Sequence, residues 1–207
     1  MIHSGKKALY VIDLETRQER LILEAIPNSA TESLEEQLRR QRLRQMDRGI
    51  TRYFWTAGGK IVIPDGNVVY IMDEINERPR LLLDGVEFPV TDPKPSPDGN
   101  TLAFVLNGEI WIVPIEGGRP QQITRGKTQG ASRGIADFIA QEEMRRPSGF
   151  WWSREGDYIA FTEVEEGHIP QFNILHSGDA DPGPASVETH RYPFSGSENP
   201  RVKLGVT

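Results

Sequence analysis

Two short sequence patterns alternate along the chain at a nearly constant interval, and this repetition constrains the fold more than any single motif. The first is an apolar strand with an aromatic residue, and two copies, at Tyr70 and Trp111, lie about 40 residues apart. The second is a Ser or Thr before a turn and another apolar strand, and Thr56 and Ser96 are separated by the same interval. A spacing of about 40–45 residues is the length of one four-stranded propeller blade. The sequence therefore predicts a mainly β fold, a partial β-propeller of four-stranded blades.

Turn residues support this prediction. Gly and Pro together make up 35 of the 207 residues, which suits many short strands better than long helices. Asp65–Asn67, Asp98–Asn100 and Glu155–Asp157 each place a Gly between two apolar strands. Residues of this kind tolerate positive φ, so we expect three hairpins at these positions.

Two intervals are too long for one blade. Tyr10 and Tyr70 are about 60 residues apart, and the interval from Ser96 to Ser153 is nearly as long, against about 40 for one blade. Each interval therefore contains an insertion of nearly twenty residues. Insertions within a repeat form loops, often on the binding face, so we expect the chemistry of the chain to lie there.

The first insertion, about 31–48, carries the one strong helix signal and is rich in arginine. Thr31 or Ser33 can cap the helix, Glu36 completes a capping box with Ser33, and Gly49 is expected to end it. Three interpretations stay open. The arginines can form a solvated face, or they can point into a cavity and hold a carbonyl or carboxylate of a ligand. An RNA-binding arm is disfavoured because five arginines are offset by four acidic residues without interleaved aromatics.

The second insertion, about 127–150, contains the adjacent carboxylates Glu142 and Glu143. Consecutive residues reach one ligand only from a helical turn or a kinked strand, since neighbours on a strand face opposite ways. A substrate ammonium would relieve their mutual repulsion and has three donors for them. The alternative is that both are solvated and pair with Arg145 and Arg146. A catalytic pair of the glycosidase kind has no other support.

Composition excludes several classes of protein. The net charge of −6 argues against nucleic-acid binding, which needs a basic face. The longest apolar run is about five residues, whereas a membrane span needs roughly 20, and no secretory signal is recognisable at the N-terminus. The absence of cysteine excludes disulfides, thiolate catalysis and cysteine metal sites. Nothing in the sequence indicates a cofactor, and the compartment stays open between cytoplasm and periplasm.

These residues carry a family resemblance. The segment 134–143, with its double Glu, and the following 149–153, with its Trp pair, resemble the double-Glu segment of the dipeptidyl peptidase IV family. The stretch 191–202, with Arg-Tyr-Pro and Asn-Pro-Arg-Val, resembles the sequence after that blade. The helix followed by 49–53 resembles the arginine-bearing segment. The resemblance covers nearly the whole chain and is best from 31 to 207.

The resemblance implies a function. Members of the family are prolyl oligopeptidase-type serine exopeptidases that remove N-terminal Xaa-Pro or Xaa-Ala dipeptides and combine a β-propeller with an α/β-hydrolase domain. Carried over by position, Glu142 and Glu143 hold the α-ammonium of the peptide. Arg44 holds the carbonyl of its second residue, with Arg40 and Arg42 as alternatives. The implied partners are peptide N-termini and the hydrolase domain of the parent, and the resemblance allows a homodimer of that parent.

The chain departs from the family in its catalytic residues. Phe194–Glu198 lacks the flanking glycines and the strand-to-helix context of a nucleophile elbow. We therefore expect residues 1–207 to form a partial propeller of roughly three to four blades, with the α/β-hydrolase domain absent and with no peptidase activity alone. The alternatives are a non-enzymatic module that binds peptides, and a truncated product whose open strand edges promote aggregation.

Overall fold

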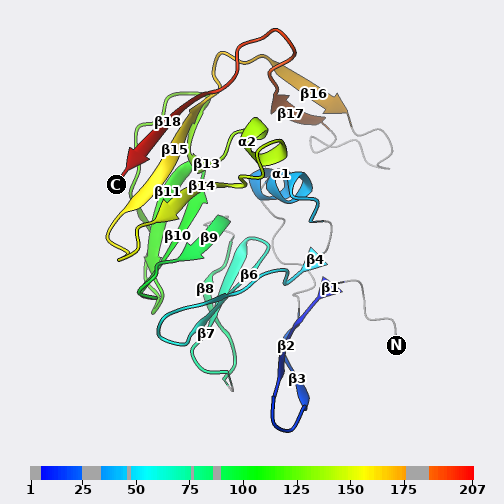
Figure 1. The fold of residues 1–207 in the computed structure, drawn as a ribbon, viewed down its shortest axis with the longest axis vertical. Helices are drawn as coiled ribbons and strands as arrows, with labels where there is room; N and C mark the ends of the chain where they lie inside the picture. The colour runs from blue at the N-terminus through cyan, green and yellow to red at the C-terminus, as the bar shows by residue number, and fades with distance from the viewer. Residues whose placement is uncertain (1–5, 25–33, 46–47, 76, 86–89, 176–186) are drawn as a thin grey trace.

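The chain forms a stack of antiparallel sheets (Figure 1). The computed structural model describes residues 6–24, 34–45, 48–75, 77–85, 90–175 and 187–207. Within these residues, three sheets have four strands each. The first contains β5 (Phe54–Trp55), β6 (Ile61–Asp65), β7 (Val68–Met72) and β8 (Arg80–Leu83); the second contains β9 (Thr91–Pro95), β10 (Thr101–Leu106), β11 (Glu109–Pro114) and β12 (Gln121–Gln122); the third contains β13 (Ala131–Ile135), β14 (Ser148–Trp152), β15 (Ile159–Glu165) and β18 (Arg201–Val206). This architecture confirms the predicted mainly β, partial propeller fold.

Three two-stranded sheets flank this stack. They are the parallel pair β1 (Lys6–Lys7) and β4 (Arg48–Gly49), the hairpin of β2 (Leu9–Ile12) and β3 (Glu19–Leu23), and the hairpin of β16 (Gln171–Leu175) and β17 (Val187–Arg191). Figure 1 shows the two hairpins extending from opposite ends of the molecule. No helix of the described residues is long and apolar enough to cross a membrane.

The core lies between the sheets because β10 is apolar on both faces. Leu102 and Phe104 pack in a cluster with Val62 and Val69 of the first sheet. The alternate residue Val105 packs with residues of the third sheet. Successive side chains of a strand point to opposite faces, so one strand contributes to two cores. The second sheet is therefore buried between the other two.

The predicted hairpin turns are confirmed. Gly66 joins β6 to β7 with a φ of 62°, Gly99 joins β9 to β10 with a φ of 78°, and Gly156 joins β14 to β15 with a φ of 83°. Positive φ at these positions carries little steric cost for glycine. The turn chemistry thus determines where each strand pair reverses.

The helix of the first insertion is shorter than predicted. α1 spans Leu34–Arg42 and not the whole of 31–48, and the proposed caps Thr31 and Ser33 lie outside the described residues. The prediction that Gly49 ends the helix is wrong, because Gly49 lies in β4. Arg44 instead takes the left-handed position, with a φ of 54°. The backbone N–H groups of Arg44 and Gln45 bind carbonyls of the last helical turn at 2.8 and 2.9 Å, as in a Schellman motif.

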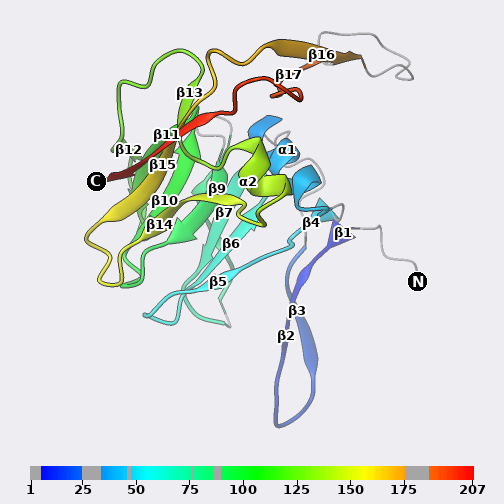
Figure 2. The same ribbon diagram turned by 45° about the horizontal axis from the view of Figure 1, so that its top comes forward.

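A second helix lies in the other insertion, where the sequence predicted only one inserted helix in the whole chain. α2 spans Phe138–Glu142, a single short turn between β13 and β14. α1 and α2 lie side by side in both views (Figures 1 and 2), although about 95 residues separate them. The fold therefore brings the two insertions together at one end of the sheets.

An ion-pair group joins strands at the edge of the first sheet, and it allows a pH-dependence prediction. Asp73 binds Lys60 Nζ at 2.5 Å and Arg80 Nε at 2.8 Å. Hydrogen bonds from Arg80 and Lys60 lower the pKa of Asp73 to about 2. Because the pKa is lower in the folded chain, this stabilisation is present above about pH 4 and is lost as the pH falls towards 2.

We expect Asp73→Asn to lower the free energy of unfolding by about 1 kcal/mol at neutral pH, since the group is partly exposed. The difference from the wild type should shrink as the pH falls below about 4. Urea unfolding at about pH 6 and about pH 3 measures both values. An equal difference at the two pH values would contradict the assigned ion pairs.

Candidate functional site

The short helix α2 presents the two adjacent carboxylates of the second insertion. Asp137 caps its N-terminus by accepting a hydrogen bond from the Ala140 N–H at 3.0 Å. The same side chain binds Arg146, whose Nη2 lies 3.2 Å from Oδ2. Glu142 is the last helical residue and Glu143 is the C-cap, and both side chains are exposed. The carboxylates therefore project from a helical turn, one of the two arrangements that let neighbouring residues reach one ligand.

Neither Glu142 nor Glu143 forms an ion pair with another residue of the described ranges. The sequence left open a pairing with Arg145 or Arg146. Arg146 is instead engaged by Asp137 on the other side of the turn. The two carboxylates are thus accessible to a ligand without first breaking an ion pair to a described residue.

The base of this turn is formed by a close crossing of β13 and β14. Gly134 and Gly149 are paired in register. A Cβ added to Gly149 would lie 2.5 Å from the backbone carbons of Gly134 and Ile135. Gly134 has a φ of 83°, and a Cβ there would lie 2.9 Å from side-chain carbons of Val105 and Ile110. Both glycines of the double-Glu motif are therefore required by packing.

The three candidate arginines of the first insertion lie in three different environments. Arg44 follows α1 and is exposed. Arg42 lies over the ring of Phe138 at the start of α2, with its guanidinium carbon 4.9 Å from the ring centroid. Arg40 lines a small cavity beside Arg39. Arg42, one of the two alternatives, thus contacts α2, and the role assigned to Arg44 stays a prediction.

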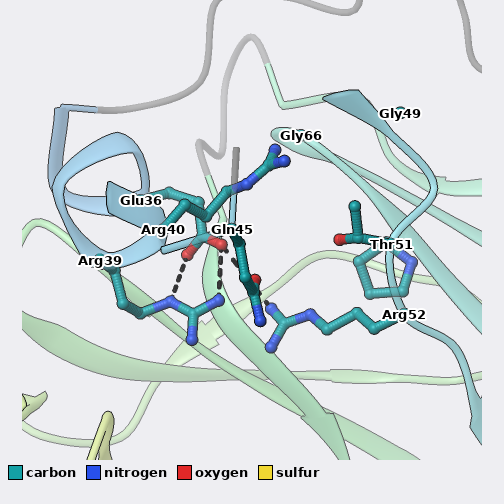
Figure 3. Close-up of a pocket in the computed structure, with 9 residues that line it drawn as sticks. Glu36, Arg39, Arg40, Gln45, Gly49, Thr51, Arg52 and Gly66 are labelled. Carbon is teal, nitrogen blue, oxygen red and sulfur yellow. Dashed lines mark hydrogen bonds and ion pairs between the residues drawn. The ribbon is translucent and has the colours of Figure 1, made fainter. Parts of the chain in front are cut away.

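A buried ion-pair network holds α1 against the sheets (Figure 3). Glu36 and Arg39 are each only 5% exposed, and Arg39 Nε and Nη2 donate to the two Glu36 oxygens at 2.8 and 2.7 Å. Asp92 of β9 lies 3.7 Å from Arg39 Nη1 and accepts a hydrogen bond from Arg52 Nη1 at 3.2 Å. Solvated arginines were one expectation for this helix, and that expectation is wrong for Arg39. Except for Asp92, these residues line a cavity of about 20 Å³.

Asp92 also reaches the third sheet through Lys94. The Lys94 Nζ lies 2.9 Å from Asp92 Oδ2 and donates to the carbonyl of Phe150 at 2.8 Å. The same Nζ lies 3.9 Å from the centroid of the Phe150 ring. Phe150 belongs to β14, the strand that follows the double-Glu turn. One carboxylate therefore connects both insertions.

Burial and neighbouring charges act together on the ionisation of this network. Burial alone would raise the pKa of Asp92, but Lys94, Arg39 and Arg52 lower it overall. Burial lowers the pKa of Lys94, against the opposing effect of Asp92. Burial and the nearby Arg39 lower the pKa of Arg52. The two carboxylates thus offset part of the cost of burying the three cations.

Sequence reasoning missed Arg52, Asp92 and Lys94. The contacts of Asp92 with Arg52 and Glu36, and of Lys94 with Phe150, join residues 40 to 56 positions apart, and no periodicity marks such contacts. The one local signal is the Asp-Pro-Lys run that opens β9, because a proline inside a strand favours a sheet edge. The run contains both members of the Asp92–Lys94 pair but does not reveal their partners in α1, at Arg52 and in β14.

A second cavity, of about 170 Å³, lies between α1, the start of α2, β13 and β17. Its lining includes Arg42, Arg191, Phe138 and Glu166. Burial raises the pKa of Glu166, partly offset by Arg42. The cavity adjoins the N-terminal end of α2, whereas Glu142 lies at the other end. Among the described residues, no group of three or more His, Cys, Asp or Glu side chains could hold a metal ion.

Asp137 caps α2 and pairs with Arg146, and two substitutions of Asp137 test how much these contacts stabilise the chain. We expect Asp137→Ala to lower the free energy of unfolding by about 2 kcal/mol, because the N-cap and the ion pair to Arg146 are both lost. Asp137→Asn keeps the capping oxygen and should cost about half as much. Urea unfolding measures both variants. Equal losses for the two would show that capping contributes nothing here.

Comparisons with known proteins agree with this architecture. Residues 65–207 match the family model of the dipeptidyl peptidase IV (DPP IV) N-terminal region. The chain is 33% identical over 118 residues to a putative dipeptidyl aminopeptidase of Schizosaccharomyces pombe, covering 54% of the chain and 15% of that protein. It is 32% identical over 113 residues to human prolyl endopeptidase FAP, covering 54% and 15%. It is 28% identical over 198 residues to human dipeptidyl peptidase 8, covering 84% and 22%. The chain thus spans less than a quarter of the length of these relatives.

Proposed function

The chain belongs to the dipeptidyl peptidase IV N-terminal region family, and we propose that it is the substrate-binding propeller part of a serine exopeptidase that removes N-terminal Xaa-Pro or Xaa-Ala dipeptides. The observation that carries this proposal is the pair of exposed carboxylates, Glu142 and Glu143, on a helical turn clamped by Asp137 and Arg146. In this role the pair binds the free α-ammonium of a peptide.

The chemistry of an ammonium suits this site. Its three N–H donors can be shared between two carboxylates, and charge-assisted hydrogen bonds are the strongest of their kind. A cation between Glu142 and Glu143 also removes the repulsion between them. An acetylated or internal peptide segment has no such charge. The site therefore selects a free peptide N-terminus and fixes its distance from the bond that is cleaved.

An arginine of the first insertion completes the proposed site by donating to a peptide carbonyl. A guanidinium keeps its charge at every physiological pH and offers several donors in one plane. Arg44 is our candidate from the sequence, and its exposure leaves it accessible. The contact of Arg42 with Phe138 makes Arg42 the competing candidate.

Binding in this way supplies positioning but no bond cleavage. Holding a substrate in place lowers the entropic part of a barrier, whereas hydrolysis also needs a nucleophile, a base and an oxyanion hole. The Gly-x-Ser-x-Gly of the sequence, at 130–134, is no nucleophile elbow, because Ser132 lies within strand β13 and pairs with Val164 of β15. We propose that hydrolysis takes place on an α/β-hydrolase domain of the parent protein.

The central test is calorimetric titration of the purified chain with a free-amine Xaa-Pro peptide and with its N-acetylated twin. We expect the free-amine peptide to bind at least about tenfold more tightly, because only it carries the ammonium. Glu142→Gln and Glu143→Gln should each abolish most of this preference. Glu155→Gln, an exposed carboxylate in the β14–β15 turn, is the matched control and should leave it intact. Equal binding of the two peptides by the wild type would overturn the proposal.

A chromogenic Xaa-Pro substrate tests whether the chain hydrolyses peptides by itself. We expect no release of the chromophore by the purified chain above the background rate. Cleavage that disappears in Glu142→Ala would contradict the assignment of hydrolysis to another domain. Cleavage that persists in Glu142→Ala would indicate a contaminating peptidase, and a second purification would then decide.

A further inference from the structure

The two insertions are held by one buried carboxylate that neither insertion contains. Asp92 lies at the start of β9, and its side chain is 5% exposed. Through Oδ1 it contacts Arg39 of α1 and Arg52 of the segment between β4 and β5. Through Oδ2 it contacts Lys94, which binds the carbonyl of Phe150 at 2.8 Å.

The backbone of Asp92 adds a second, independent sign of a special position. Its φ is 48°, in the left-handed region, and its N–H donates to Glu36 Oε2 at 3.3 Å. Left-handed backbone is costly for most residues and is tolerated by Asp and Asn. Strain of this kind persists only where the surrounding contacts over-determine it. Here the contacts are the ion pairs to α1 and the link to β14.

The balance of charges in the network explains why the position of α1 depends on Asp92. Among the described groups of the network, three cations (Arg39, Arg52 and Lys94) surround two carboxylates (Glu36 and Asp92). Removing the charge of Asp92 would leave three cations around one carboxylate. Cations that lie close together in a buried site repel one another strongly. We expect α1 to move away from β9 and the Lys94 contact with Phe150 to loosen.

We propose that Asp92 is a positioning residue that sets the place of the arginine-bearing helix α1 relative to the double-Glu turn. This inference rests on the proposed function for its effect on peptide binding, since Asp92 touches neither Glu142 nor Arg44. The claim that Asp92 fixes the position of α1 relative to β14 is independent of that function. Asp92 holds α1 by Arg39 and holds β14, the strand leaving the turn, by Lys94.

The test uses Asp92→Asn, which keeps the shape of the side chain and tolerates the left-handed backbone while removing the charge. Asp73→Asn is the matched control, because Asp73 also binds one Lys and one Arg but connects neither insertion. Lys94→Met is the second variant. It removes the ammonium that links Asp92 to Phe150 and leaves Asp92 paired with Arg39 and Arg52. This variant therefore keeps the test valid if Asp92→Asn fails to fold.

The first readout is a distance between spin labels. The chain has no cysteine, so Gln41→Cys on α1 and Arg154→Cys in the β14–β15 turn label only those two exposed sites. We expect the distribution of distances between the labels to shift or broaden in Asp92→Asn, to change less in Lys94→Met, and to stay as in the wild type in Asp73→Asn. An unchanged distribution in Asp92→Asn overturns the inference.

The second readout is the affinity for the free-amine Xaa-Pro peptide. We expect the Kd to rise about tenfold in Asp92→Asn and about threefold in Lys94→Met, with no change in Asp73→Asn. Wild-type affinity in a folded Asp92→Asn overturns the role of Asp92 in the site. If the wild type itself does not distinguish the free-amine from the acetylated peptide, the proposed function fails, and the label distances alone decide on Asp92.

Discussion

The apolar residues on both faces of β10 are the constraint that sets the arrangement of all three large sheets. Leu102 and Phe104 pack against the first sheet, while Val105 packs against the third. Burial of this kind supplies most of the free energy that holds sheets together. The stacking also decides where the ends of the strands meet. The insertions before β5 and between β12 and β14 therefore emerge on the same side of the stacked sheets, where α1 and α2 lie next to each other (Figure 2).

The buried ion-pair network around Asp92 has a different role from the apolar core. Moving Glu36, Arg39 and Asp92 out of water is costly, and buried ion pairs are weak evidence for stability. They are directional, however, and each hydrogen bond specifies a distance that apolar packing would leave loose. A helix held by such a network has one place on the sheets. This is what a site built from two separate insertions requires.

Much of the fold and part of the site could be predicted from the sequence. The interval of about 40 residues predicted the blades because each blade is one unit of supersecondary structure. The adjacency of Glu142 and Glu143 meant that both could reach one ligand only from a helical turn or a kinked strand, and α2 ends in such a turn; the shared ligand stays a prediction. The length of α1 was overestimated, because Arg44 adopts the left-handed conformation that glycine normally supplies. Local helix signals alone do not reveal that ending.

The strand pattern, the turns and the position of the two insertions could be read from the sequence, since they depend on residues close together along the chain. The stacking of the sheets, in contrast, was needed to show that Arg39 is buried, that Arg42 lies over Phe138, and that Asp92 joins α1 to β14. The difference follows from the range of the interactions. Ion pairs and cation–π contacts form between whichever groups the stacked sheets bring within a few ångströms. The residues concerned are 40 to 96 positions apart in the sequence, and no local sequence pattern links them.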